Sequence, residues 1–220
     1  QRARAAAAGE VGRVRLAFVS TIGFEQLPRW VRDFRAQCPN VVLELVEATG
    51  DVQLQALARG DIDAGLLLHS PGAAPPGLAQ LVVQREPLVL ALPQAHALAQ
   101  PGPLRMAHVL AEPLVLFPRR LVPSLHDAIL GLYQAAGRLP QVAQEAIQMQ
   151  TIVNLVSAGI GVAWVPTSVM SFQRPGVAYQ PVSGAPVCET SLIWRSDATP
   201  AVLRFVEHVK TQGANSETQG

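Results

Sequence analysis

The chain has 220 residues, almost half of them apolar and only 15% charged, so it can build a large core in one domain or in two smaller lobes. Its formal net charge of +1 excludes the strong basic field that holds a phosphate backbone, so the chain alone is predicted to bind nucleic acid poorly. Two cysteines, Cys38 and Cys188, form neither a CxxC pair nor a metal-ligand spacing, which favours free buried thiols in a reducing compartment.

The first half of the chain alternates predicted strands with predicted helices. Strands are predicted at 13–19, 41–46, 62–68, 78–83 and 87–92. One helix is predicted over 24–38, with an inward face made of Leu27, Trp30, Val31, Phe34 and Cys38. A second helix begins at Thr49 or Asp51 and runs through Ala58, with Gly60 as its stop. This alternation predicts a sheet built from βα units.

The second half of the chain repeats the alternation. Strands are predicted at 114–117, 142–145, 161–165, 177–181 and 188–194. Helices are predicted at 124–136, 148–158 and 199–210, and Gly137 and Gly159 end the first two. The residues expected to face inward are Leu125, Ile129, Leu132, Tyr133 and Ala136 in the first helix, Ile152, Leu155 and Val156 in the second, and Val202, Phe205, Val206 and Val209 in the third.

Two βα runs of similar size predict an α/β fold of two Rossmann-like lobes joined by a hinge. Lobe I is assigned residues 11–92 and 185–212, and lobe II residues 93–184, with crossings in the loops at 93–103 and 181–186. Residues 1–10 are interpreted as the end of a linker helix and 213–220 as a disordered tail. The N-terminus lacks the apolar core of a signal peptide, and no apolar run is long enough to span a bilayer, so a cytoplasmic location is expected.

Motifs for catalysis, metals and nucleotides are weak. The five histidines show no HExxH pattern, so no metal is expected, and no serine lies in a GxSxG elbow. Gly159-Ile160-Gly161 follows a helix and precedes a strand, the reverse of a dinucleotide-binding turn. Arg59-Gly60-Asp61 is better explained as a helix stop than as an adhesion tripeptide. The sequence therefore predicts no enzyme, no cofactor and no metal.

Polar residues gather where predicted strands end and helices begin. Ser20 and Thr21 follow the first strand, Thr49 follows the second, and Gln148 and Met149 stand at the same point in lobe II. Helix N-termini offer unpaired N–H groups and a partial positive charge, so these positions predict a site for a small anion. Simple N-capping explains each position singly, and that alternative stays open.

Phe117, Pro118 and Arg119 follow the first strand of lobe II and are also assigned to the site. An arginine here could pair with a ligand carboxylate through its two-pronged guanidinium. A solvated basic turn formed by Arg119 and Arg120 explains the same residues equally well, and either arginine could face the ligand.

Several segments together resemble the effector-binding domain of LysR-type transcriptional regulators over roughly residues 11 to 210. The matching segments are Gly12 to Phe18, Leu27-Pro28, Phe34, Cys38-Pro39, Val42 to Glu47, Leu57 to Gly65 and Leu155 to Pro166. Within the family the chain looks closest to regulators of aromatic-compound degradation, on Glu25, Leu27-Pro28 and Leu116 to Pro118. By position, Thr21 and Thr49 match hydroxyls that hold the effector, and Phe117 with Pro118 matches the wall of lobe II. His69-Ser70 departs from the basic residues found in those relatives.

The resemblance implies a fold like type 2 periplasmic binding proteins and a small anionic effector, an aromatic carboxylate, held in the cleft between the lobes. It also implies a homodimer or homotetramer, with the Leu27–Cys38 helix antiparallel to the partner's Ser124–Ala136 helix. DNA would be bound only through an N-terminal winged helix-turn-helix that this chain lacks, and no membrane partner is expected. A solute-binding protein of a transport system is the alternative function, and an enzyme of the same fold is a weaker one.

Overall fold

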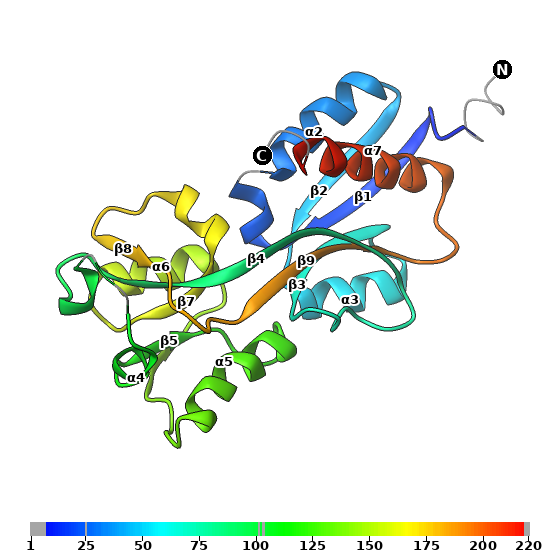
Figure 1. The fold of residues 1–220 in the computed structure, drawn as a ribbon. Helices are drawn as coiled ribbons and strands as arrows, with labels where there is room; N and C mark the ends of the chain where they lie inside the picture. The colour runs from blue at the N-terminus through cyan, green and yellow to red at the C-terminus, as the bar shows by residue number, and fades with distance from the viewer. Residues whose placement is uncertain (1–7, 25, 101, 103, 218–220) are drawn as a thin grey trace. The chain divides into compact units, whose positions relative to one another are not determined.

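The computed structural model describes residues 8–24, 26–100, 102 and 104–217, and describes side chains as far as residue 213. The chain divides into two compact units. Unit 1 comprises Gln1–Leu68, Ala74–Arg85 and Glu189–Gly220, and unit 2 comprises His69–Ala73 and Glu86–Cys188. Figure 1 shows the elements along the chain. Glu25 and residues 1–7 of the predicted linker remnant lie outside the described residues.

Two strands, β4 (Ala79–Pro93) and β9 (Val187–Trp194), contain residues of both units. The sequence predicted two strands in place of β4, but the structure continues the strand through Pro87, whose carbonyl oxygen accepts a hydrogen bond from Thr167 Oγ1 at 2.8 Å. The chain passes between the two units at Leu68/His69, Ala73/Ala74, Arg85/Glu86 and Cys188/Glu189, and the last two of these points lie inside strands.

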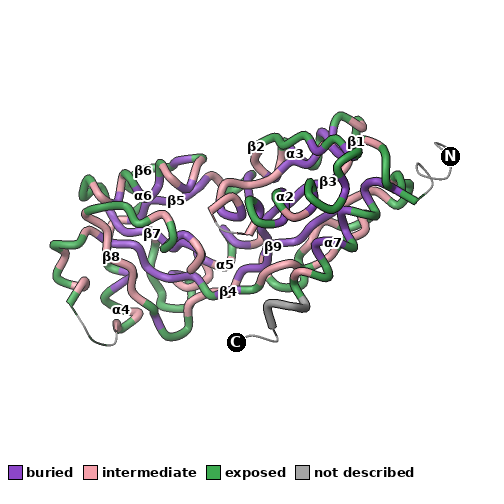
Figure 2. The backbone as a smooth tube through the Cα atoms, turned by 90° about the horizontal axis from the view of Figure 1, so that it is seen from above, coloured by how far each residue is buried: buried purple, intermediate pink, exposed green. Residues whose placement is uncertain are grey.

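The sheet of unit 1 has the strand order β2-β1-β3-β9-β4. β1 (Gly12–Phe18) lies parallel to β2 (Val41–Glu47) on one side and to β3 (Ala64–His69) on the other. β3 is buried along its whole length, as the purple tube in Figure 2 shows. This agrees with the apolar run that predicted a buried parallel strand.

Helices cover both faces of this sheet. α2 (Gln26–Gln37) and α7 (Pro200–Glu217) pack on the face that carries Leu16, Leu66 and Leu192. α3 (Gly50–Arg59) packs on the face that carries the next residue of each strand, which are Ala17, Leu67 and Ile193. Neighbouring residues of a strand point to opposite faces of the sheet. One short run of apolar residues therefore packs against helices on both faces.

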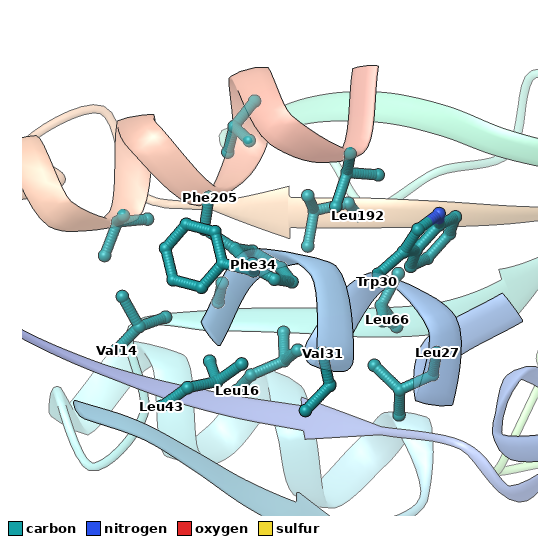
Figure 3. Packing of buried hydrophobic residues seen from close by; sticks show 14 of the residues in the cluster. Val14, Leu16, Leu27, Trp30, Val31, Phe34, Leu43, Leu66, Leu192 and Phe205 are labelled. Atoms are coloured by element: carbon teal, nitrogen blue, oxygen red, sulfur yellow. The ribbon is translucent and has the colours of Figure 1, made fainter. Parts of the chain in front are cut away.

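The larger core cluster of unit 1 joins α2 to α7 (Figure 3). The rings of Phe34 and Phe205 meet edge to face, with centroids 5.1 Å apart. The predicted inward faces of both helices are confirmed: the buried side chains are Leu27, Trp30, Val31, Phe34 and Cys38 on or beside α2, and Val202, Phe205, Val206 and Val209 on α7. Cys38 and Cys188 are free and buried, as predicted.

An ion pair fastens the segment after Gly60 to β1. Gly60 ends α3 in the left-handed conformation (φ 75°) and its N–H donates to the carbonyl oxygen of Leu57 at 3.1 Å, so the predicted helix stop is confirmed. The chain then returns to Asp63, whose carboxylate accepts from the Arg15 backbone N–H, Nε and Nη2 at 2.8, 3.1 and 2.7 Å. These bonds fasten the start of β3 to the middle of β1.

Unit 2 has two groups of strands. β4 pairs antiparallel with β7 (Ala163–Pro166) and β8 (Val177–Gln180). β5 (Leu114–Leu116) pairs parallel with β6 (Val142–Glu145). The remaining helical segments of the described chain are α4 (Met106–Val109), α5 (Pro123–Ala135), α6 (Met149–Ser157) and the 3-10 turns η1 (Ser20–Phe24), η2 (Ala97–Ala99) and η3 (Thr167–Phe172).

The predicted faces of the unit 2 helices are partly wrong. On α5, Leu125, Ile129 and Tyr133 are buried, but Leu132 is half-buried and Ala136 is exposed just past the helix end. On α6, Val153 is fully buried where the sequence favoured Leu155. Both errors come from choosing among neighbouring apolar residues when only a narrow stripe faces the sheet.

The C-terminal helix continues further than predicted. α7 runs through Glu217, into the range assigned to a disordered tail, and 218–220 lie outside the described residues. No helix of the described chain has the length and apolar character to cross a membrane.

The Arg15–Asp63 pair gives a prediction about stability. Burial raises the pKa of the Asp63 carboxyl, but the hydrogen bonds from Arg15 outweigh it, so the pKa lies below its ordinary value. Asp63→Asn should lower the free energy of unfolding at pH 7 by about 1–2 kcal/mol, because charged hydrogen bonds are lost. A carboxyl with a depressed pKa stabilises the fold above the unfolded-state pKa of about 4 and loses that effect as the pH falls through the folded-state value.

Urea unfolding from pH 7 to pH 3 measures this effect. The gap between the parent and Asp63→Asn should narrow as the pH falls below about 4. Asp61→Asn is the matched control, because Asp61 pairs with Arg59 at the exposed surface and should contribute less than about 0.5 kcal/mol. Equal effects of the two variants would contradict the role of Asp63.

Candidate ligand-binding site

In unit 1, parallel pairing brings three predicted site residues to one edge of the sheet. β1 and β2 end together, with Phe18 opposite Glu47, and the Ala48 N–H donates to the Phe18 carbonyl oxygen at 3.0 Å. Ser20 and Thr21 follow β1, and Thr49 follows β2. The carboxyl edge of a parallel sheet is where α/β folds bind ligands. The structure therefore places these residues directly after the ends of two neighbouring strands.

Thr21 is the most unusual of the three. Its residue is 5% exposed in η1, and its hydroxyl Oγ1 has no hydrogen-bond partner in the described structure. A buried hydroxyl without a partner destabilises a fold, so such groups are uncommon and often mark sites where another molecule supplies the partner.

Thr49 does not cap α3 with its side chain, so the N-capping interpretation fails at this position. Its Oγ1 donates to the Asp51 carboxylate at 2.5 Å. Asp51 lies in the first turn of α3, where a negative charge is favourable. An anion approaching Thr49 would therefore meet a helix end that already holds a carboxylate, which leaves more of the binding to Thr21 and the amides of η1.

In unit 2, Phe117 and Gln148 stand at equivalent strand ends. β5 and β6 end with Leu116 opposite Glu145, and the Ala146 N–H donates to the Leu116 carbonyl oxygen at 3.0 Å. Phe117 is 7% exposed and Pro118 after it is half-buried. Gln148 is half-buried at the start of α6 and makes no side-chain cap, and Met149 after it is buried. Three of these residues are apolar and one carries an amide.

Arg119 is paired within its own unit. Its Nε and Nη2 donate to the two Asp127 carboxylate oxygens at 2.8 and 2.7 Å, and both side chains are more than half exposed. The hydrogen bonds from Arg119 hold the pKa of Asp127 below its ordinary value. This contact uses the guanidinium fork that was assigned to a ligand carboxylate, so the structure favours the alternative of a solvated basic turn for Arg119.

Sequence reasoning missed a polar cluster in unit 2 around Ser70. The Ser70 N–H donates to Ser124 Oγ at 3.0 Å, and the Ser70 hydroxyl is a buried oxygen atom with no partner in the described structure. Ser124 lies in the first turn of α5, and the ring of His126 on that helix meets Phe117 edge to face at 6.0 Å. The available signal was the departure of His69-Ser70 from the basic residues of the related regulators.

A separate groove of about 450 Å³ lies in unit 1 between α2, β4 and α7. Its lining includes Trp30, Leu81 and Val83 together with Arg85 and Lys210. Arg85 pairs with Glu189 at 3.6 Å, and Lys210 lies 3.9 Å from Glu207. The groove is a competing location for a ligand, and none of the predicted site residues lines it.

The strand-end residues carry groups suited to binding a small ligand through hydrogen bonds. Hydroxyls, one amide and backbone N–H groups can hold an anion or a polar ring substituent. Within the described residues, no three histidine, cysteine, aspartate or glutamate side chains come together as metal ligands.

Comparison with known proteins identifies the family. Residues 7–214 match the model of the LysR substrate binding domain. The chain belongs to this family. It is 40% identical over 209 residues to the HTH-type transcriptional regulator IlvR of Caulobacter vibrioides, covering 94% of this chain and 70% of that protein. The relatives that match this LysR domain are transcriptional regulators and not enzymes.

Solved structures agree with this assignment. CbnR, a LysR family transcriptional regulator, is 31% identical with a TM-score of 0.78 and covers 94% of this chain and 72% of its own. The effector binding domain of BenM with its effector benzoate has a TM-score of 0.77 at 24% identity and 94% coverage of both chains, which supports the fold alone. The predicted fold, like that of type 2 periplasmic binding proteins, is confirmed for the LysR domain.

The unpartnered hydroxyl of Thr21 gives a prediction for the free LysR domain. Thr21→Val keeps the shape of the side chain and removes a buried oxygen that has no hydrogen-bond partner among the described residues. The free energy of unfolding should stay unchanged or rise by up to about 2 kcal/mol. Urea unfolding measures it.

Thr167→Val is the matched control, because its hydroxyl donates to the Pro87 carbonyl oxygen. This variant should lose about 1 kcal/mol. A loss of more than about 1 kcal/mol in Thr21→Val would show that the hydroxyl is structural.

Proposed function

We propose that this LysR domain senses a small aromatic carboxylate and that the ligand engages the strand-end groups of unit 1 and of unit 2. The proposed contacts in unit 1 are Ser20, Thr21 and Thr49. Those in unit 2 are Phe117, Pro118, Gln148 and Met149. Ser70 and Ser124 are added to this set. The observation that carries the proposal is the buried Thr21 hydroxyl, which lacks a partner at the carboxyl edge of parallel strands.

The chemistry of both sets of groups supports an aromatic anion. Hydroxyl and amide donors pair with a carboxylate through charge-assisted hydrogen bonds, which are stronger than neutral ones. Phe117 and Met149 are apolar groups suited to a ring. Arg119 is left out of the carboxylate contact because Asp127 already accepts from it. BenM, which shares the fold, binds benzoate, and that fact guides the choice of probe.

The mechanism follows from differential affinity. A ligand that binds one arrangement of the two units more tightly than another shifts the population toward it. A difference of a few kcal/mol is enough for a switch. In a full-length regulator the shift would reach an N-terminal DNA-binding domain through a homodimer or homotetramer. CbnR has been solved in a complex with its target DNA.

The alternative function, a solute-binding protein of a transport system, is not favoured. It would share the fold, but the family model and the relatives are those of transcriptional regulators. Regulation of transcription also implies action in the cytoplasm, where the chromosome lies.

Calorimetry of the domain tests the proposal. The panel pairs benzoate, salicylate and phenylacetate with their neutral amides. At least one acid should bind more than tenfold more tightly than its amide, because the donors favour a charged acceptor. The Thr21→Val variant should lose at least tenfold in affinity for that acid, and Thr167→Val should bind like the parent. Amides that bind as tightly as acids, or full affinity in Thr21→Val, would overturn the proposal.

A further inference from the structure

We propose that Gln53 is the positioning residue of the unit 1 site, and that Gly65 is a glycine because the Gln53 side chain occupies the space beside it. The ligand-binding consequence of this inference rests on the proposed function. The structural part, a coupled Gln53–Gly65 pair that holds the ends of β1 and β2 against the middle of β3, stands on the geometry alone.

Gln53 lies on α3 and is fully buried, which is unusual for a glutamine. Its Nε2 donates two hydrogen bonds, to the Ala48 carbonyl oxygen at 2.8 Å and to the Leu66 carbonyl oxygen at 3.0 Å. Both neighbours of Nε2 are carbonyl oxygens, which only accept. The amide orientation is therefore fixed by chemistry, because the opposite assignment would place oxygen against oxygen.

The two acceptors belong to different strands. Ala48 directly follows β2, and Leu66 lies in β3. The Leu66 carbonyl oxygen also accepts from the Val19 N–H at 3.0 Å, which ties in the end of β1. One side-chain amide thus ties the residues that follow β1 and β2 to the middle of β3.

The residues held in this way carry the proposed ligand groups. Val19 precedes Ser20 and Thr21, and Ala48 precedes Thr49. Binding groups on strand ends need a second layer of hydrogen bonds to hold their geometry. Gln53 provides that layer without contacting the ligand, since its side chain is enclosed by the protein.

Gly65 fits this arrangement for a steric reason. It pairs with Ala17 in the middle of the parallel ladder and is not among the glycines with positive φ, so backbone conformation does not require it. A Cβ at position 65 would lie 2.5 Å from Gln53 Oε1 and 3.5 Å from Ile193 Cγ1. The first distance is a clash, whereas the second is an ordinary contact. A side chain at position 65 therefore requires the Gln53 amide to move from the place where it makes its two hydrogen bonds.

The first experiment replaces the amide with a thioether of similar size. Gln53→Met removes both donors, and Gln55→Met is the matched control because Gln55 is exposed on the same helix. Amide hydrogen exchange of the free domain should speed up at least tenfold at Val19 and Ala48 in Gln53→Met and stay unchanged in Gln55→Met. Equal exchange in the two variants would overturn the inference.

The second experiment tests the coupling with a double-mutant cycle. Gly65→Ala alone should displace the Gln53 amide and reproduce the faster exchange and the lower urea midpoint of Gln53→Met. In a Gln53→Ala background the space is free, so adding Gly65→Ala should shift the midpoint by less than half as much. Additive effects of the two substitutions would show that Gly65 is required for another reason.

The ligand readout separates positioning from stability. For an acid that binds the parent, Gln53→Met should weaken binding at least tenfold. Val202→Ala, which opens a cavity in the core under α7, should lower the urea midpoint but leave affinity unchanged. Equal affinity in Gln53→Met and the parent would refute the positioning role. If no acid binds the parent, the proposed function fails, and the exchange and cycle measurements still decide whether the Gln53–Gly65 pair exists.

Discussion

The parallel pairing of β1 with β2 and β3 is the constraint on which the structure of unit 1 depends. Because the three strands run in one direction, their carboxyl ends and the turns after them share one edge. The Arg15–Asp63 ion pair fixes the start of β3 against β1, and the Gln53 amide ties the residue after β2 to the middle of β3. A rigid frame of this kind can hold a buried hydroxyl such as that of Thr21 without a partner, because relaxation of the loop is restricted.

Unit 2 uses the same physical arrangement with different side chains. β5 and β6 are parallel and end in register, so Phe117 and Gln148 come to one edge. Ser70 and Ser124 add a second cluster of hydroxyls near α5. In both units, groups that can donate hydrogen bonds therefore lie just after the ends of parallel strands. The matching family model is that of a substrate binding domain, which is the basis for proposing a ligand-binding role for these groups.

Much of the fold could be predicted from the sequence because its signals are local. The apolar run before His69, the stop at Gly60 and the stripe of α2 each depend on neighbouring residues, and all three were confirmed. The continuity of β4 could not be predicted, because it depends on Thr167 and Pro186, which bind at Pro87 and Leu88 from distant parts of the chain. The same limit applies to the site. Strand-end hydroxyls are visible in the sequence, but the pairing of Arg119 with Asp127 and the burial of Gln53 are tertiary facts.

A titration followed by two-dimensional ¹H–¹⁵N NMR tests directly whether the strand-end groups hold a carboxylate. Benzoate is added to the labelled domain and the backbone amides are followed individually. If the strand-end groups hold the carboxylate, the largest chemical-shift changes will fall on the backbone amides at 19–22, 48–50, 70, 117 and 148. Chemical-shift changes concentrated instead around Trp30, Val83 and Lys210 would place the ligand in the groove of unit 1 and contradict binding at the strand ends.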